Sequence, residues 1–137
     1  MANSLLTKEQ AWQENFDLFD NWQDRYQFIM EQGRKLDGIP EHSRLESMLV
    51  KGCQSQVWMQ IDLTNEHLNL KADSDALIVK GLIAIMKDIY HQQPLSEIIN
   101  YDHGFAERLG LKDHLSQTRA NGLFAMQSQI LKVILNT

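Results

Sequence analysis

The middle of the chain carries the clearest alternation of hydrophobic and polar positions. Residues 57–63 alternate between apolar and mostly polar side chains, and residues 67–72 resume the alternation after a short polar stretch. A period of two is typical of a strand with one buried face, and two such runs joined by a polar turn predict a β-hairpin. The expected inward-facing residues are Val57, Met59, Ile61, Leu63, Leu68, Leu70 and Ala72. Residues 47–50 are a third strand candidate, although residues 45–50 fit a helix equally well.

Helical spacing dominates the first third of the chain. The sequence predicts a helix capped by Thr7 and a second helix capped by Asp20 or Asn21. Gly33 is a plausible terminator of the second helix. Residues 36–43 hold a glycine, a proline and mixed polar residues, which indicates a surface loop.

The segment after the hairpin, residues 76–90, is apolar nearly all round, as is typical of the buried central helix of a small domain. Residues 73–75 offer capping groups at its start. Short helices are predicted from Pro94 to Ile99 and over residues 105–109, and Ser116 can cap a last helix. The apolar stripe of that last helix is Leu123, Met126, Ile130 and Ile134. Together these elements predict an α+β fold: a small antiparallel three-stranded sheet with helices packed on one side.

Length and composition narrow the function classes. The 137 residues, 43% of them hydrophobic, predict one domain over residues 1–137. The net charge of −5 argues against a nucleic-acid-binding surface. The longest apolar run, residues 82–86, is far shorter than the roughly 20 residues a spanning helix needs, so we expect no membrane partner. A single cysteine excludes an intramolecular disulfide and a multi-cysteine metal site in this chain, and it fits a cytoplasmic location.

That single cysteine, Cys53, is the first candidate for chemistry. Lone cytosolic cysteines are most often small buried residues. Cys53, however, lies between Gly52 and the polar residues 54–56, just before the first predicted strand, where a loop tip is expected. A neighbouring glycine leaves room for another molecule to approach the thiol. The pattern therefore indicates a reactive thiol, although the one adjacent cation in the sequence is Lys51.

The five histidines are scattered along the chain and show no metal-ligand spacing; they are His42, His67, His91, His103 and His114. Each is expected to lie at the surface or to pair with a nearby backbone group. A cysteine–histidine pair assembled in space, as in a cysteine-dependent hydrolase, stays open at this point.

Arg119 occupies a locally unfavourable position, because the first turn of a helix disfavours a cation. Three residues later, Gly122 costs a helix interior about 1 kcal/mol relative to alanine. Two such choices close together indicate an outside constraint, such as a buried partner for the arginine and a closely approaching backbone at the glycine. A structural bridge from Arg119 to a carboxylate is the favoured alternative.

Several stretches together carry a family resemblance. Residues 50–58 are Val-Lys-Gly-Cys-Gln-Ser-Gln-Val-Trp, and residues 73–82 are Asp-Ser-Asp-Ala-Leu-Ile-Val-Lys-Gly-Leu. Together with residues 22–26, 109–111 and 115–123, this pattern resembles the SufE family of sulfur acceptors from about residue 20 onward. The Gly-Cys-Gln-Ser-Gln-Val-Trp stretch is the specific part of the match.

The resemblance implies a fold similar to the IscU scaffold proteins, without the several cysteines with which those proteins ligate a cluster. It also implies a role. A SufE-like protein takes sulfur from the persulfide of a pyridoxal-phosphate cysteine desulfurase, SufS, and enhances the turnover of that enzyme. It holds the sulfur as a persulfide and passes it to the SufBCD scaffold. The acceptor cysteine of the family maps onto Cys53, and its conserved arginine near the cysteine loop maps onto Arg119.

The chemistry of sulfur transfer fits a single exposed thiol. A thiol attacks the outer sulfur of a persulfide and a thiolate leaves, as in thiol–disulfide exchange. No second thiol of the same chain can then discharge the persulfide. The pyridoxal chemistry belongs to the partner, so no cofactor or metal is expected on this chain, and we expect a monomer. Our hypothesis is that Cys53 is withdrawn in the free protein and swings out on docking. The alternatives are a stand-alone cysteine-dependent enzyme and a binding regulator with an incidental cysteine.

Overall fold

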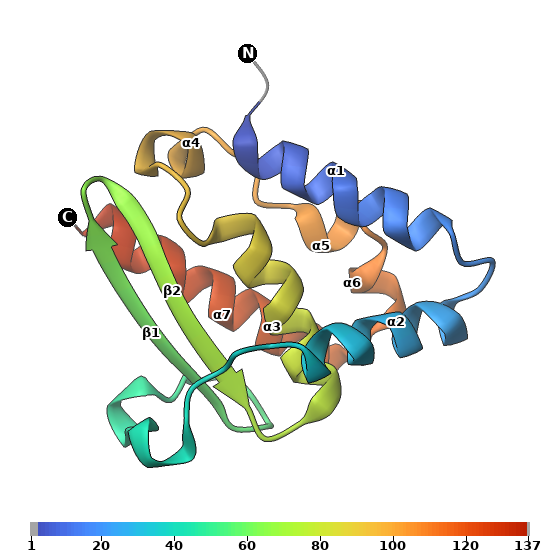
Figure 1. Ribbon diagram of the computed structural model, residues 1–137, viewed down its shortest axis with the longest axis horizontal. Helices are drawn as coiled ribbons and strands as arrows, with labels where there is room; N and C mark the ends of the chain where they lie inside the picture. The colour runs from blue at the N-terminus through green and yellow to red at the C-terminus, as the bar shows by residue number, and fades with distance from the viewer. Residues whose placement is uncertain (1–2, 137) are drawn as a thin grey trace.

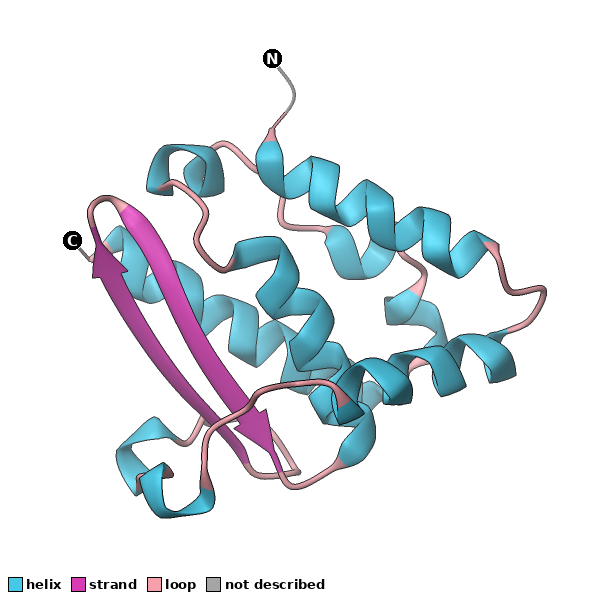
Figure 2. Ribbon diagram, in the orientation of Figure 1, coloured by secondary structure: helices cyan, strands magenta, loops and turns pink. Residues whose placement is uncertain are grey.

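The computed structural model describes residues 3–136, in which the α-helices gather on one side of a β-hairpin (Figure 1, Figure 2). The elements are α1 (Ser4–Asp17), α2 (Trp22–Arg34), η1 (Glu41–Ser43), η2 (Glu46–Met48), β1 (Val57–Thr64), β2 (His67–Ser74), α3 (Leu77–Tyr90), α4 (Leu95–Ile99), α5 (Phe105–Arg108), α6 (Leu111–His114) and α7 (Gln117–Leu135), where η marks a 3₁₀ helix. The α3 helix packs against β2 and the α7 helix against β1. The α+β class is therefore confirmed.

The hairpin is confirmed in position and register. Strands β1 and β2 pair antiparallel from Val57 opposite Ser74 to Thr64 opposite His67. The two turn residues, Asn65 and Glu66, have φ of 53° and 61°, the left-handed conformation that matches a two-residue turn to the twist of the strands.

The predicted third strand is wrong. Residues 46–48 form the 3₁₀ turn η2, and the chain then meets β1 in a single bridge, Leu49 opposite Trp58. The backbone N–H of Val50 donates to the carbonyl of Val57 at 2.9 Å. The tight turn prevents the extended conformation from continuing, so the sheet formed by residues 3–136 has two strands.

Helix α3 is the buried centre of the molecule, as predicted, and its contact with α2 is close enough to require glycine. A Cβ added at Gly33 would lie 2.7 Å from the carbonyl oxygen of Leu77, and one added at Gly81 would lie 2.2 Å from that of Ile29. The prediction that Gly33 ends α2 is wrong, because the helix continues through Arg34.

Within residues 3–136 no helix is both long and apolar enough to cross a bilayer.

The helix starts confirm some of the predicted caps. The side-chain oxygen of Asn21 accepts from the N–H of Asp24 at 2.9 Å, and Ser116 caps α7. The first helix begins earlier than expected, with Asn3 as its cap in place of Thr7.

The predicted capping role of residues 73–75 is also corrected. Ala76 is the residue before α3 and forms no side-chain cap. Asp73 is buried and faces the segment between α2 and η2, where its carboxylate accepts from the N–H of Ile39 at 2.8 Å and pairs with Arg44 at 2.9 Å. The guanidinium of Arg44 also stacks over the Trp58 ring, 4.7 Å from its centroid. This contact covers the outer face of the hairpin.

Candidate functional site

The thiol lies on a short loop, residues 51–55, which we call the cysteine loop. Both ends of the loop are held to the hairpin. At its start, the bond between Val50 and Val57 fixes the backbone. At its end, the Ser74 hydroxyl donates to the carbonyl of Gln56 at 2.8 Å. Between these anchors, residues 51–55 belong to no helix or strand, so the loop can turn about its two ends.

Within the loop, Cys53 is half-buried against the first half of α7. Its Sγ lies 3.6 Å from the carbonyl oxygen of Gly122, to which the S–H group donates. A Cβ added at Gly122 would also lie 3.6 Å from Sγ. The thiol, and not a neighbouring backbone, is therefore the group that approaches this helical glycine. Gly52, with φ of 93°, makes the turn that directs the chain toward α7.

Beside the thiol is a cavity of about 420 Å³ with both apolar and polar lining residues. The apolar lining residues are Val57, Val79, Leu82 and Met126. The polar ones are Gln54, Ser55, Ser116, Thr118 and Arg119. Burial raises the pKa of the Cys53 thiol above its ordinary value, so the thiol is protonated near neutral pH.

Arg119 lies in the first turn of α7 and its side chain faces solvent at the mouth of this cavity. It forms no ion pair or side-chain hydrogen bond with any residue of 3–136. The expected bridge to a carboxylate is therefore wrong. The two predicted site residues, Cys53 and Arg119, are 66 positions apart in sequence, and both line this cavity. Their roles remain a prediction.

The histidines do not reach the thiol. Among the described residues no histidine lines the cavity, and no group of three or more acidic, histidine or cysteine side chains could hold a metal ion. His91 accepts from the N–H of Leu70 at 3.0 Å, and His103 is bonded to the Tyr90 hydroxyl at 2.6 Å. The structure thus offers Cys53 no histidine as a general base.

The sequence did not predict the other residues that line the cavity. Gln54 and Ser55 follow Cys53 in the chain and Thr118 precedes Arg119, so the position of each beside a predicted site residue was the signal that could have identified it. The apolar lining residues carried no signal of their own, because Val79 and Leu82 belong to a helix that is apolar almost throughout. Lys51, the cation next to the cysteine in sequence, lines a different groove.

Two comparisons with known proteins identify the same family. A family model described as "SufE: Fe-S metabolism associated domain" matches residues 10–134. An uncharacterized SufE-like protein of Rhizobium meliloti (strain 1021) is 39% identical over 122 residues, which cover 85% of this chain and 87% of the relative. The solution structure of a hypothetical protein from Thermus thermophilus superposes with a TM-score of 0.76 over 94% of each chain; at 20% identity it shows a shared fold alone.

Proposed function

The chain belongs to the SufE family, and from this premise we propose that it is the sulfur acceptor and activator of a cysteine desulfurase of the SufS type. Membership itself gives the chain a role in iron–sulfur metabolism. One observation carries the finer proposal: the single thiol of the chain, on a loop anchored at both ends, shares a cavity with the guanidinium of Arg119, which pairs with no residue of 3–136.

The proposed transfer moves one sulfur atom without net oxidation. Cys53 releases its proton to solvent, and its thiolate attacks the outer sulfur of a persulfide on the donor cysteine. A new S–S bond forms on Cys53, the S–S bond of the donor breaks, and the donor cysteine leaves as a thiolate. Cys53 then carries the persulfide to a SufBCD-type scaffold, whose attacking thiol takes the outer sulfur in the same way.

The resting position of Cys53 favours the protonated form of the thiol. The raised pKa favours the thiol over the thiolate, which is the nucleophile. The bond to the Gly122 carbonyl also requires the S–H proton, and an anionic sulfur would be repelled by that oxygen. We therefore propose that the cysteine loop leaves α7 when the donor docks, turning between its two anchors.

Arg119 is suited to stabilise the anionic states of this sulfur. A guanidinium favours a nearby thiolate or persulfide anion through charge-assisted hydrogen bonds. No carboxylate of residues 3–136 pairs with the Arg119 guanidinium. A persulfide on Cys53 in the same cavity could therefore bind this guanidinium without breaking an existing ion pair.

The test is loading of the thiol by a desulfurase. The protein is incubated with a cysteine desulfurase, pyridoxal phosphate and cysteine, and its intact mass is measured. We expect a reducible gain of one sulfur atom that is absent in Cys53→Ser. As a matched control, the double variant Cys53→Ser/Ser55→Cys keeps one thiol in the same loop and should load far more slowly.

Three outcomes discriminate the alternatives. No gain in mass with an actively turning-over desulfurase would contradict the acceptor role. Stimulation of the desulfurase that persists in Cys53→Ser would favour a binding regulator. Hydrolysis of acyl substrates by the protein alone would favour a cysteine-dependent enzyme, which the lack of a histidine at the described cavity disfavours.

A further inference from the structure

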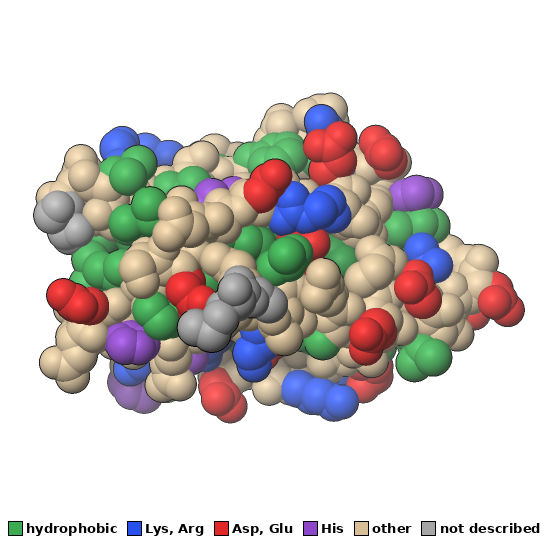
Figure 3. Space-filling view, turned by 90° about the horizontal axis from the view of Figure 1, so that it is seen from above, with side chains coloured by type: hydrophobic (Ala, Val, Ile, Leu, Met, Phe, Trp, Pro, Cys, Tyr) green, Lys and Arg blue, Asp and Glu red, His purple; other side chains and the backbone are tan. Residues whose placement is uncertain are grey.

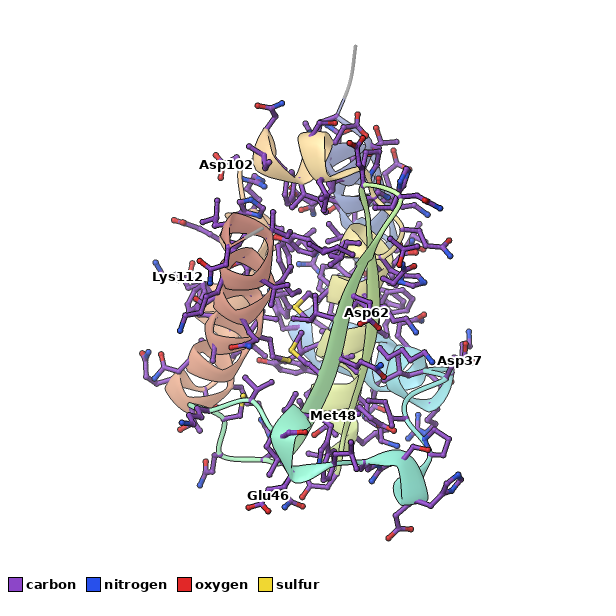
Figure 4. All side chains as sticks on the ribbon, turned by 90° about the vertical axis from the view of Figure 1, so that its left-hand side faces the viewer. Asp37, Glu46, Met48, Asp62, Asp102 and Lys112 are labelled. Atoms are coloured by element: carbon purple, nitrogen blue, oxygen red, sulfur yellow. The ribbon has the colours of Figure 1, made fainter. Side chains whose placement is uncertain are left out.

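A second hollow adjoins the start of the cysteine loop and is lined by different residues from the thiol cavity. It lies between residues 47–51 and the second half of α7, with a volume of about 830 Å³, and we call it the α7 groove. Figure 4 shows this side of the molecule, with α7 beside the hairpin and Met48 on the segment that crosses below them.

The α7 groove exposes apolar side chains from two separate segments. Leu135 is 73% exposed and Leu49 is 37% exposed, and the half-buried Leu131 also lines the groove. Phe124, also exposed, precedes Leu131 by seven residues and so shares its face of α7. A cluster of exposed apolar side chains is typical of a surface that binds another molecule.

The charged side chains that line the groove are all positive. Its charged lining residues are Lys51 and Lys132, and neither forms an ion pair with another described residue. Helix α7 carries no carboxylate at all, although the whole chain has a net charge of −5. By contrast, the face over α1 and α4 mixes acidic and basic side chains (Figure 3). The complementary partner surface is therefore apolar and bears carboxylates.

The groove also adjoins the start of the cysteine loop. Lys51 begins the cysteine loop, and a Cβ added at Gly52 would lie 3.4 Å from the Cβ of Ala125, which lines the groove. A specific protein interface covers about 800 Å² on each partner, from roughly 20 to 30 residues. A five-residue loop is too small to supply that area. A protein that reaches Cys53 must therefore rest on neighbouring surface as well.

We propose that the α7 groove is the docking surface for the sulfur donor, and that it receives a donor segment with leucine-sized apolar side chains flanked by carboxylates. This inference rests on the proposed function, since it takes the protein that loads Cys53 as its occupant. The groove holds the donor, while the cysteine loop remains free to move between its anchors.

The test combines two substitutions far from the thiol, Lys132→Glu and Leu135→Asp. Both side chains are exposed, so the fold should be unaffected. The double variant should weaken binding to the desulfurase by roughly tenfold or more. Loading of Cys53 by inorganic polysulfide, which needs no docking, should stay at the wild-type rate. The matched controls are Lys112→Glu and Leu18→Asp, exposed positions outside the groove, which should bind within about twofold of wild type.

The outcomes separate the two proposals. Normal binding of the double variant to a desulfurase that loads wild-type Cys53 would overturn the groove and leave the acceptor role intact. Failure of the desulfurase to load even the wild type would overturn both. If the double variant abolishes self-association of the protein in sedimentation and leaves desulfurase binding unchanged, the occupant is a second copy and the donor assignment is wrong.

Discussion

The thiol of Cys53 rests where its own chemistry is suppressed, because half-burial against α7 raises its pKa. We predict that alkylation of the free protein by iodoacetamide follows a pH profile whose midpoint lies above the ordinary thiol pKa of about 8.5. The reactive thiolate should thus be scarce at neutral pH and increase as pH rises. In urea the midpoint should return to the ordinary value. A midpoint at or below about 8.5 in the folded protein would contradict the withdrawn position.

Arg119 differs from most arginines in a folded domain, since no described residue pairs with it. Arg119→Ala should therefore change the free energy of unfolding by no more than about 0.5 kcal/mol. Its loading rate should fall by roughly tenfold to a hundredfold, the equivalent of one charge-assisted hydrogen bond. Arg119→Lys should recover part of the rate. Stopped-flow or quenched loading followed by mass spectrometry measures this, and a large loss of stability would instead indicate a structural role.

The sequence singled out residues that line one cavity but misjudged their contacts. Arg119 and Gly122 stood out as locally unfavourable in a helix, and both do lie at the cavity. The sequence favoured a carboxylate partner for the arginine and a backbone neighbour for the glycine. The actual neighbour of the glycine is the Cys53 sulfur, 3.6 Å from its carbonyl oxygen. Which loop docks on α7 depends on the packing of the whole chain, which local patterns do not contain.

Alanine substitutions at two helical glycines, Gly81 in α3 and Gly122 in α7, should change the free energy of unfolding in opposite directions. At Gly81 a Cβ would lie 2.2 Å from the Ile29 carbonyl oxygen in α2, so Gly81→Ala forces α2 and α3 apart. We expect a loss of about 2–3 kcal/mol in the free energy of unfolding, more than the helix propensity gained. Gly122→Ala meets only an ordinary contact at 3.6 Å and should gain up to about 1 kcal/mol. Urea denaturation compares them, and equal effects would contradict the close packing of α2 on α3.

The elements that the sequence predicted correctly are those with a local signal of adequate length. The hairpin followed from alternation over residues 57–72, and α3 from its nearly continuous apolar character. Residues 45–50 fitted two conformations equally, and the chain adopts neither in full, because a 3₁₀ turn leaves room for one bridge to β1. Gly33 has the composition of a helix end, yet it serves the contact with α3.

For the molecule as a whole, Asp73 is the residue that joins the α2–β1 connection to the hairpin. Its carboxylate accepts from Ile39, pairs with Arg44, and lies 3.7 Å from the Lys80 ammonium. A Cβ added at Gly38, whose φ is 62°, would lie 2.3 Å from a carboxylate oxygen, so the connection turns tightly around this group. The sequence suggested only a helix cap here, since the partners of Asp73 in that connection lie far earlier in the chain and show no spacing pattern.

We therefore predict that Asp73→Asn lowers the free energy of unfolding at pH 7 by about 3 kcal/mol, because it removes the charge of a buried pair. The side chain remains nearly isosteric, so the loss reports charge and not volume. The neighbouring Ser74 hydroxyl holds the end of the cysteine loop. The same variant should thus alkylate faster at Cys53 than the wild type. Unchanged stability at pH 7 would contradict the role of this carboxylate.

The pH dependence of that difference follows from the pKa of Asp73. Burial alone would raise this pKa, but the N–H groups of Ile39 and Ser74, with Lys80 and Arg44, together hold it below its ordinary value. A carboxyl group with a lowered folded-state pKa stabilises the protein above its unfolded pKa of about 3.9 and loses that contribution as pH falls. The stability difference between wild type and Asp73→Asn should therefore be constant from about pH 5 to 7 and shrink below about pH 4. Urea denaturation of both proteins across this range measures it, and a difference that grows on acidification would show that the carboxylate is destabilising in the fold.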